Sequence, residues 1–169
     1  WAQVGTVMNQ DQLWGPSPFT RLHNLTISGR TVLPGGMTVS GVARYMGGEP
    51  FQITNSAIDG NMNGIGPDPS PPGSYSGSGN NAITVKNDGG AFGAVGPNFV
   101  QLDMRFGYRV RPGTGNTLDI FFDIFNITNR ANFNNPSGDE RLSNFLILRS
   151  LRGGSGFPRA AQFGVRFGF

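Results

Sequence analysis

Alternation of apolar and polar residues dominates this chain and is clearest over its last eight positions. If these residues are extended, one side of the chain carries Phe163, Val165, Phe167 and Phe169, and the other side carries Gln162, Gly164, Arg166 and Gly168. A period of two predicts a strand with one apolar and one polar face. A soluble protein seldom ends on an exposed apolar strand, because such a face and its open edge promote aggregation. The pattern is more typical of a membrane β-barrel, whose outer face lies in lipid.

Two hairpins precede the final strand, which we expect over residues 159–169. The first hairpin joins residues 19–33 to residues 37–47 through the tight turn Pro34-Gly35-Gly36. The second joins residues 100–110 to residues 117–125 and is the clearest in the chain, because alternate residues of both strands are apolar.

The second hairpin predicts its own register when residue 111 is paired with residue 117. Four favourable pairs then face one another: Arg109 with Asp119, Arg105 with Asp123, Phe106 with Phe122, and Gly107 with Phe121, where the glycine leaves room for the ring. Opposite charges and aromatic pairs across a ladder each contribute about 0.2–1 kcal/mol. A slip of one residue would destroy all four pairs, so the register is self-consistent.

The connections between the five expected strands alternate between short and long. Residues 48–97 show little periodicity beyond an extended start, and residues 130–158 form a second long connection with one apolar run at residues 145–148 that suits a short strand. Another short strand is expected at residues 3–8. Long loops on one side and tight turns on the other are the asymmetry of outer-membrane barrels, with the long loops extracellular. An eleven-residue strand tilted by about 40° rises roughly 27 Å, close to the apolar band of such barrels.

Composition narrows the alternatives. The chain has 169 residues, enough for one domain, and contains no cysteine, so disulfides and thiolate metal sites are excluded. Its 27 glycines and 12 prolines agree with many turns and loops. The net charge of +3 comes from scattered basic residues, which argues against a nucleic-acid partner. No apolar run reaches the 18 or so residues of a membrane helix. The chain begins at Trp1, without a signal peptide, and we interpret it as a piece of a longer protein.

Candidate chemistry is sparse. Asp59, Asn61, Asn63 and Gly64 match the opening of a calcium loop, but Ser70 stands at the twelfth position, where an acidic ligand is needed. An Asx-rich turn is therefore the default interpretation, with calcium as the alternative, and no other metal or cofactor is expected. His23 is the only histidine. No acid–base constellation can be built around it, so we expect no enzyme activity.

Several motifs resemble the C-terminal end of TonB-dependent outer-membrane receptors, in the branch with an N-terminal carboxypeptidase-regulatory-like domain. The motifs, with the family patterns they are similar to, are Gly47-Gly48-Glu49-Pro50-Phe51 ("SGxPF"), Asp59-Gly60-Asn61-Met62-Asn63-Gly64 ("DxNGDG"), Phe99-Val100-Gln101-Leu102-Asp103-Met104-Arg105 ("FxxLDxR"), Phe125-Asn126-Ile127-Thr128-Asn129-Arg130-Ala131-Asn132-Phe133 ("FNxxNRxNF") and the ending Gln162-x-Gly164-x-x-Phe167-x-Phe169. The likeness covers about residues 19–169. It departs in the loop at Asn63, which lacks the second acidic residue of the family.

The resemblance implies a parent receptor whose barrel has about 22 strands and a plug. Residues 1–169 would supply about five of these strands, an antiparallel up-and-down segment that cannot close a barrel alone. The implied location is the outer membrane of a Gram-negative bacterium. The implied partners are outer-membrane lipid, the rest of the parent barrel and plug, TonB through the parent, and the barrel assembly machinery. That machinery would read Gln162, Gly164, Phe167 and Phe169. The implied function is part of energised uptake of a bound substrate.

The alternation assigns each strand residue to one of two faces. The expected lipid face holds Val100, Leu102, Met104, Phe106, Tyr108, Leu118, Ile120, Phe122, Ile124, Phe163, Val165, Phe167 and Phe169. The expected lumen face holds Gln101, Asp103, Arg105, Arg109, Asp119, Asp123, Gln162 and Arg166. Paired wall charges explain the carboxylates better than catalysis does. The alternative is a soluble or surface all-β binding or adhesion module, which would bury Phe106 and Phe122 in a core between two sheets.

Overall fold

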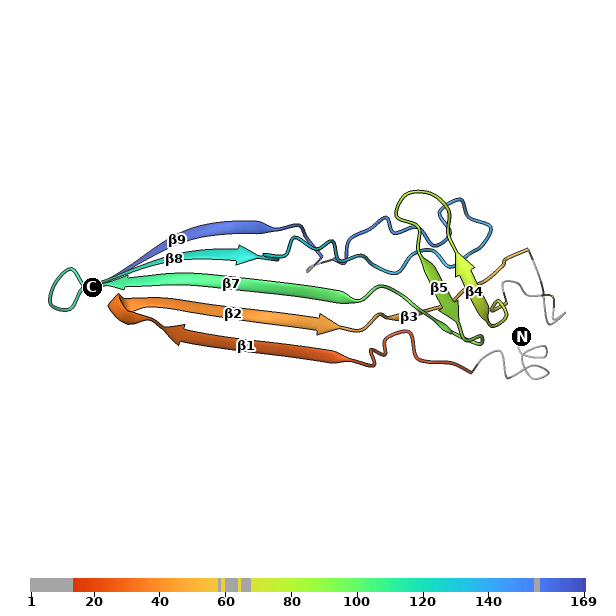
Figure 1. Ribbon diagram of the computed structural model, residues 1–169, viewed down its shortest axis with the longest axis horizontal. Helices are drawn as coiled ribbons and strands as arrows, with labels where there is room; N and C mark the ends of the chain where they lie inside the picture. The colour runs from red at the N-terminus through yellow and green to blue at the C-terminus, as the bar shows by residue number, and fades with distance from the viewer. Residues whose placement is uncertain (1–13, 58, 60–63, 65–67, 154–155) are drawn as a thin grey trace. The chain divides into compact units, whose positions relative to one another are not determined.

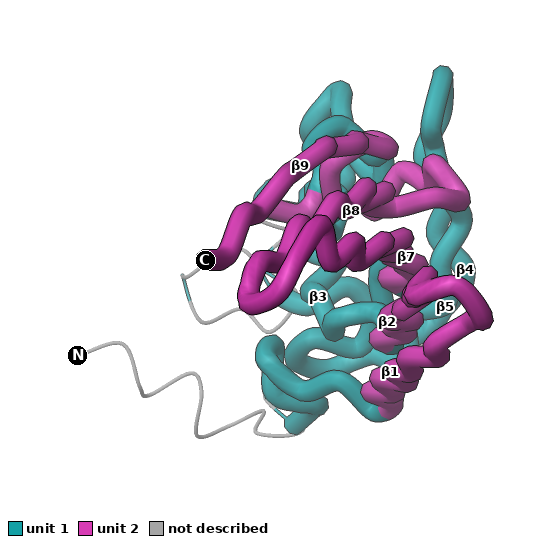
Figure 2. Tube along the Cα trace, turned by 90° about the vertical axis from the view of Figure 1, so that its left-hand side faces the viewer, with its two compact units in different colours: residues 1–22, 47–98, 133–151 teal, residues 23–46, 99–132, 152–169 magenta. Residues whose placement is uncertain are grey.

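A computed structural model describes residues 14–57, 59, 64, 68–153 and 156–169. The chain divides into two compact units (Figure 2). Unit 1 comprises Trp1–Leu22, Gly47–Asn98 and Phe133–Leu151, and unit 2 comprises His23–Met46, Phe99–Asn132 and Arg152–Phe169. The described elements are antiparallel strands and one turn of 3-10 helix, which confirms the all-β, antiparallel prediction. The short strand expected at residues 3–8 lies outside the described residues.

Unit 2 is a five-stranded antiparallel sheet (Figure 1). Its strands, in spatial order, are β1 (Asn24–Val32), β2 (Met37–Met46), β7 (Phe99–Val110), β8 (Thr117–Phe125) and β9 (Ala160–Gly168). Each matches a predicted strand, and the largest difference is at the start of β1, which begins five residues after the predicted residue 19. Neighbours in space are also neighbours in this series, so the sheet runs up and down without a crossover.

The two tight turns of unit 2 lie at the end of the sheet where β9 finishes (Figure 1). The β1–β2 turn is the 3-10 segment η2 (Pro34–Gly36), in which Gly35 and Gly36 have φ values of 84° and 86°. Such positive φ values favour glycine because it has no Cβ. The long connections leave from the opposite end, so the predicted alternation of short and long connections is confirmed for this sheet.

The predicted register of the β7–β8 hairpin is confirmed at all four pairs, including Phe106 opposite Phe122 and Gly107 opposite Phe121. One detail is wrong. The Phe121 ring does not use the space over Gly107, where a Cβ would lie 2.5 Å from Oγ1 of Thr38. The ring instead lies over Gly164 of β9, where a Cβ would lie 2.2 Å from Cζ of Phe121.

Unit 1 corrects the prediction that residues 48–97 are mostly irregular. They form a second antiparallel sheet, in the order β3 (Pro50–Phe51), β6 (Ala94–Val95), β5 (Thr84–Asn87) and β4 (Gly73–Ser76). These strands have two to four residues each, too short for a periodic pattern to reveal them. A small core supports this sheet, built from Phe51, Ile53, Val85, Ala94 and Leu146.

Residues 133–151 belong to the same unit and supply Leu146 to its core. The short strand expected at residues 145–148 is not formed. Phe145 and Ile147 make only single bridges, to Ser137 and Ala82, and Leu146 between them has a positive φ of 52°. That backbone conformation interrupts an extended strand. The two long connections of the chain therefore fold together rather than as independent loops.

Candidate functional site

The polar face of the five-stranded sheet carries the charged residues predicted for the lumen. Pairing across the strands aligns them in rows, and side chains of directly paired residues lie on one face. One row runs Arg30, Ser40, Arg105, Asp123, Gln162. A second row ends with Arg109, Asp119 and Arg166.

Asp123 is the most buried carboxylate of this face, with 3% of its surface exposed. Arg105 clamps it in a bidentate pair, with Nε 2.5 Å from Oδ1 and Nη2 2.8 Å from Oδ2. Gln162 donates from Nε2 to the same Oδ2 at 2.9 Å. One carboxylate thus joins β7, β8 and β9.

Asp119 makes a similar bidentate pair with Arg109, at 2.5 and 2.9 Å, but this pair is more exposed. Screening by water makes such an exposed pair weaker than the pair at Asp123.

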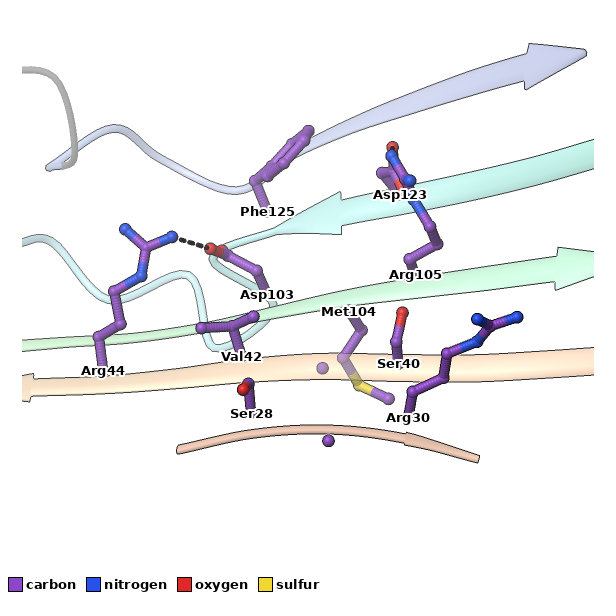
Figure 3. A pocket seen from close by; sticks show the side chains of 12 residues that line it. Ser28, Arg30, Ser40, Val42, Arg44, Asp103, Met104, Arg105, Asp123 and Phe125 are labelled. Atoms are coloured by element: carbon purple, nitrogen blue, oxygen red, sulfur yellow. Dashed lines mark hydrogen bonds and ion pairs between the residues drawn. The ribbon is translucent and has the colours of Figure 1, made fainter. Parts of the chain in front are cut away.

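A hollow of about 610 Å³ opens on this face (Figure 3). Arg30, Arg44 and Arg105 line it together with Asp103 and Asp123, and Phe125 stands at its edge. A second hollow of about 310 Å³ lies nearer the tight turns and is lined by Arg30, Arg105, Arg109, Arg111 and Asp119, among others.

Hydrogen bonds of Asp103 and two asparagines stabilise the end of this sheet that lies opposite the tight turns. Asp103 accepts from the backbone N–H of Asn126 at 2.8 Å, from Gln101 Nε2 at 2.7 Å and from Arg44 Nη2 at 3.4 Å. The Asn126 side chain donates to the carbonyls of Arg130 and Phe157, both at 2.9 Å.

Asn132 is equally buried and pairs with both backbone groups of Val100, at 2.9 and 3.0 Å. Both asparagines lie in the FNxxNRxNF-like motif, and the motif alone did not predict these contacts. The signal at Asn126 was an asparagine directly after an apolar strand, where its amide can replace missing ladder partners, whereas Asn132, seven residues beyond β8, has no such signal.

The opposite face is apolar and open. Leu102, Met104, Leu118, Ile120 and Ile124 are half-buried between their neighbours. Other apolar side chains around them are exposed by 36–67%: Leu25, Ile27, Met37, Phe106, Tyr108, Phe122, Phe163, Val165 and Phe167. Their pairing places them in adjoining rows, for example Val39, Phe106, Phe122 and Phe163. Soluble monomers rarely expose a contiguous apolar surface of this extent.

The residues expected to form the assembly signal divide into two kinds of environment. Gln162 and Gly164 contact Asp123 and Phe121 of the neighbouring strand β8. Phe167 and Phe169 are 55% and 101% exposed, with ring centroids 6.2 Å apart.

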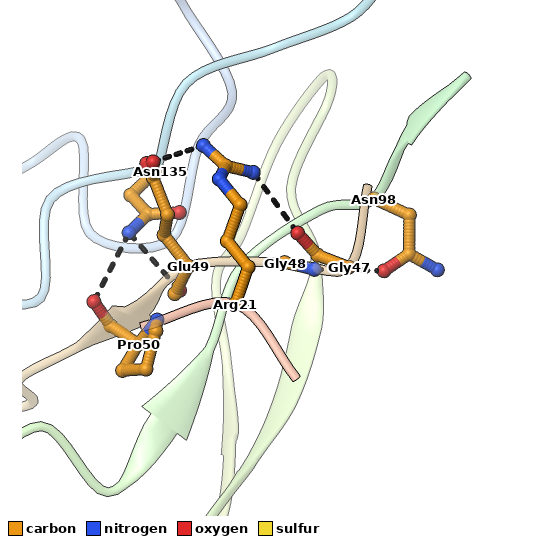
Figure 4. A network of polar contacts seen from close by, with 7 residues as sticks. All are labelled: Arg21, Gly47, Gly48, Glu49, Pro50, Asn98 and Asn135. Atoms are coloured by element: carbon orange, nitrogen blue, oxygen red, sulfur yellow. Dashed lines mark hydrogen bonds and ion pairs between the residues drawn. The ribbon is translucent and has the colours of Figure 1, made fainter. Parts of the chain in front are cut away.

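A polar network holds the start of β3 in unit 1 (Figure 4). Arg21 pairs with Glu49 and donates to the carbonyl of Gly47 at 3.0 Å. Asn135 donates to the carbonyls of Glu49 and Pro50, at 3.2 and 3.4 Å. The "SGxPF"-like stretch is thus fixed on both sides.

Asp139 fixes the second long connection to the first. Its carboxylate accepts from the backbone N–H of Arg141 and the hydroxyl of Ser56, both at 3.0 Å. The Arg141 N–H holds the pKa of Asp139 below its ordinary value of 3.8, and the Ser56 hydroxyl adds to the effect.

Metal candidates are few. Asn61 and Asn63 of the calcium-like loop lie outside the described residues, while Asp59 accepts from the backbone N–H of Gly64, five positions on, at 2.7 Å. Among the described residues no three His, Asp or Glu side chains gather closely enough to hold a metal ion. Over the same part of the chain, no helix has the length and apolar character needed to cross a membrane.

Comparison of the chain with protein-family models, with curated proteins and with solved structures finds no match.

Proposed function

We propose that the five-stranded sheet is part of an outer-membrane β-barrel and that the chain is the C-terminal segment of a TonB-dependent receptor. The observation that carries the proposal is the contrast between the two sheet faces. One face is apolar over adjoining rows and exposed, and the other is occupied by bidentate Arg–Asp pairs.

A lipid bilayer would cover the exposed apolar face and leave the ion-paired face in a polar interior. Burying a large apolar side chain contributes about 1.5–3 kcal/mol, so nine such exposed side chains favour an apolar phase strongly. The ion-paired face would look into the barrel interior, which is polar in these proteins.

The edges of the sheet agree with a segment of a larger barrel. β1 and β9 each pair on one side only within the described residues. An unpaired strand edge cannot remain open in hydrocarbon, because its backbone groups need partners. The preceding strand of the parent barrel would pair with β1, and the first strand of that barrel would pair with β9.

The receptor family is proposed from the sequence motifs. The FxxLDxR-like stretch opens β7, and its Asp103 accepts the backbone N–H of Asn126 from the FNxxNRxNF-like stretch. The two motifs thus contact each other, which explains why they would occur together. Substrate uptake, TonB coupling and recognition by the assembly machinery would belong to the parent protein, and we propose no catalytic role.

Two matched Phe→Arg variants test the lipid assignment. Phe106 and Phe125 are 36% and 41% exposed, but Phe106 lies on the apolar face and Phe125 lines the polar hollow. In detergent or phospholipid, Phe106→Arg should cost about 2–4 kcal/mol of unfolding free energy, as a charge on the lipid side does near mid-membrane. Phe125→Arg should change it little, because its arginine would meet water and Asp103. Denaturant unfolding followed by far-UV circular dichroism measures both.

Equal effects of the two variants would contradict the lipid assignment. A chain that refolds and stays monomeric without detergent would support the alternative, a soluble or surface all-β binding or adhesion module.

A further inference from the structure

The smaller hollow on the polar face combines a surplus of arginines with a confined volume. Four arginines and the carboxylate of Asp119 line its 310 Å³, and Asp123 beside it pairs with one of the four, Arg105. Two of them, Arg105 and Arg109, each use Nε and Nη2 on an aspartate. A guanidinium carries five N–H donors, so each retains donors for another acceptor.

Arg30 and Arg111 make no such ion pair within the described residues. Neither guanidinium makes a hydrogen bond or ion pair with any residue that the structure describes. Both residues are exposed and line the hollow. Like charges gathered in this way repel one another unless an anion lies between them.

The strands bring these arginines to the hollow from two sides. Arg30 lies on β1, and Ser40 of β2 separates it from Arg105 of β7 in the same row. Their backbones are therefore about 10 Å apart at the usual strand spacing, a gap that two arginine side chains span. Arg111 approaches from beyond the end of β7. Phe121 closes the side toward β9, with Arg105 4.9 Å above its ring.

We propose that this hollow binds a small anion that carries two or more phosphate groups. Phosphate oxygens point in several directions, so one group can accept from guanidinium groups that converge from different strands. A volume of 310 Å³ is at the lower end of small-molecule sites. The site belongs to the sheet itself, so the inference does not depend on whether the apolar face meets lipid.

Calorimetric titration of the refolded 169-residue chain with inorganic pyrophosphate tests the proposal. Wild type should bind one equivalent, and Arg30→Gln and Arg111→Gln should each weaken binding about tenfold or more, because each removes a charge-assisted contact. The matched control is Arg149→Gln, which removes one positive charge from an exposed position of unit 1. It should bind as wild type does, and circular dichroism should show that all three variants are folded.

Three results would overturn the proposal. They are an absence of saturable binding to folded wild type, equal losses in Arg149→Gln and Arg30→Gln, and citrate binding as tightly as pyrophosphate, which would indicate charge attraction without phosphate recognition. Detergent dependence of the chain decides the membrane question separately.

Discussion

Gly164→Ala should destabilise the five-stranded sheet through a single contact. The added Cβ would lie 2.2 Å from Cζ and 2.4 Å from Cε2 of Phe121, distances at which real atoms do not coexist. The ring must therefore move. Its displacement disturbs the Arg105 guanidinium, which lies 4.9 Å from the ring centroid and also holds Asp123.

The expected cost follows from three contributions. Overpacking a well-filled site costs about 1–3 kcal/mol. Weakening an exposed cation–π contact costs about 0.5–1 kcal/mol. Alanine in place of glycine inside a strand stabilises the folded chain by about 0.5–1 kcal/mol, which offsets part of this loss. The net expectation is a loss of about 1–3 kcal/mol in the free energy of unfolding.

Gly29→Ala is the matched control, because Gly29 lies in the other edge strand and a Cβ there would meet nothing within 4 Å. It should be neutral or slightly stabilising. Denaturant unfolding of both variants, and of Gly164→Ala in a Phe121→Ala background, measures the effect. The loss should vanish once the ring is gone. If Gly164→Ala costs the same with and without the ring, the steric explanation is wrong.

Two further predictions concern carboxylates. Asp123→Asn should lower the free energy of unfolding by about 1.5–3 kcal/mol, because it weakens charge-assisted bonds from Arg105 and Gln162 to a buried group. The control Asp88→Asn, in an exposed pair with Lys86, should leave the free energy of unfolding unchanged in the same denaturation assay. The depressed pKa of Asp139 stabilises the folded chain above its ordinary value of 3.8, and that stabilisation is lost as pH falls through the folded-state pKa. Below about pH 4 the unfolding free energy of Asp139→Asn should therefore fall less steeply than that of wild type, and parallel pH curves would contradict this.

The five-stranded sheet was predictable because its information is local. In the β7–β8 hairpin, the two residues of each of the four predicted pairs lie within twenty positions of one another in the sequence. A strict period of two then leaves only one register that satisfies them. The same alternation extended the prediction to the final strand.

Unit 1 was not predictable in this way because its contacts join distant segments. Leu146 completes a core whose other members lie at residues 51–94, and Asn135 bonds to Glu49 and Pro50 across more than eighty positions. Strands of two to four residues carry no readable period. Nothing in the sequence indicated that the two long connections share one core, since one buried leucine in a loop has no local signature.

The polar face shows a similar division. Alternation placed the arginines and aspartates on one side, and opposite charge predicted two of the pairs. It did not predict Gln162 on Asp123, because that contact depends on how β9 registers against β8. Nor did it predict the unpaired arginines at the smaller hollow, since Arg30 comes from a different hairpin from Arg109.

The contacts of β9 separate two roles that the sequence motif combines. Gln162 and Gly164 are used inside the folded sheet, by a buried carboxylate and by an aromatic ring. Phe167 and Phe169 are exposed, so their rings stay available to a partner. Substitutions at the first pair should therefore change the stability of the folded sheet. Polar substitution of Phe169, whose ring is fully exposed, should leave that stability intact, and under the proposed function it would weaken recognition by the assembly machinery. The proposed assembly signal would then combine residues that hold the β8–β9 register with a surface for recognition, and the two could be lost independently.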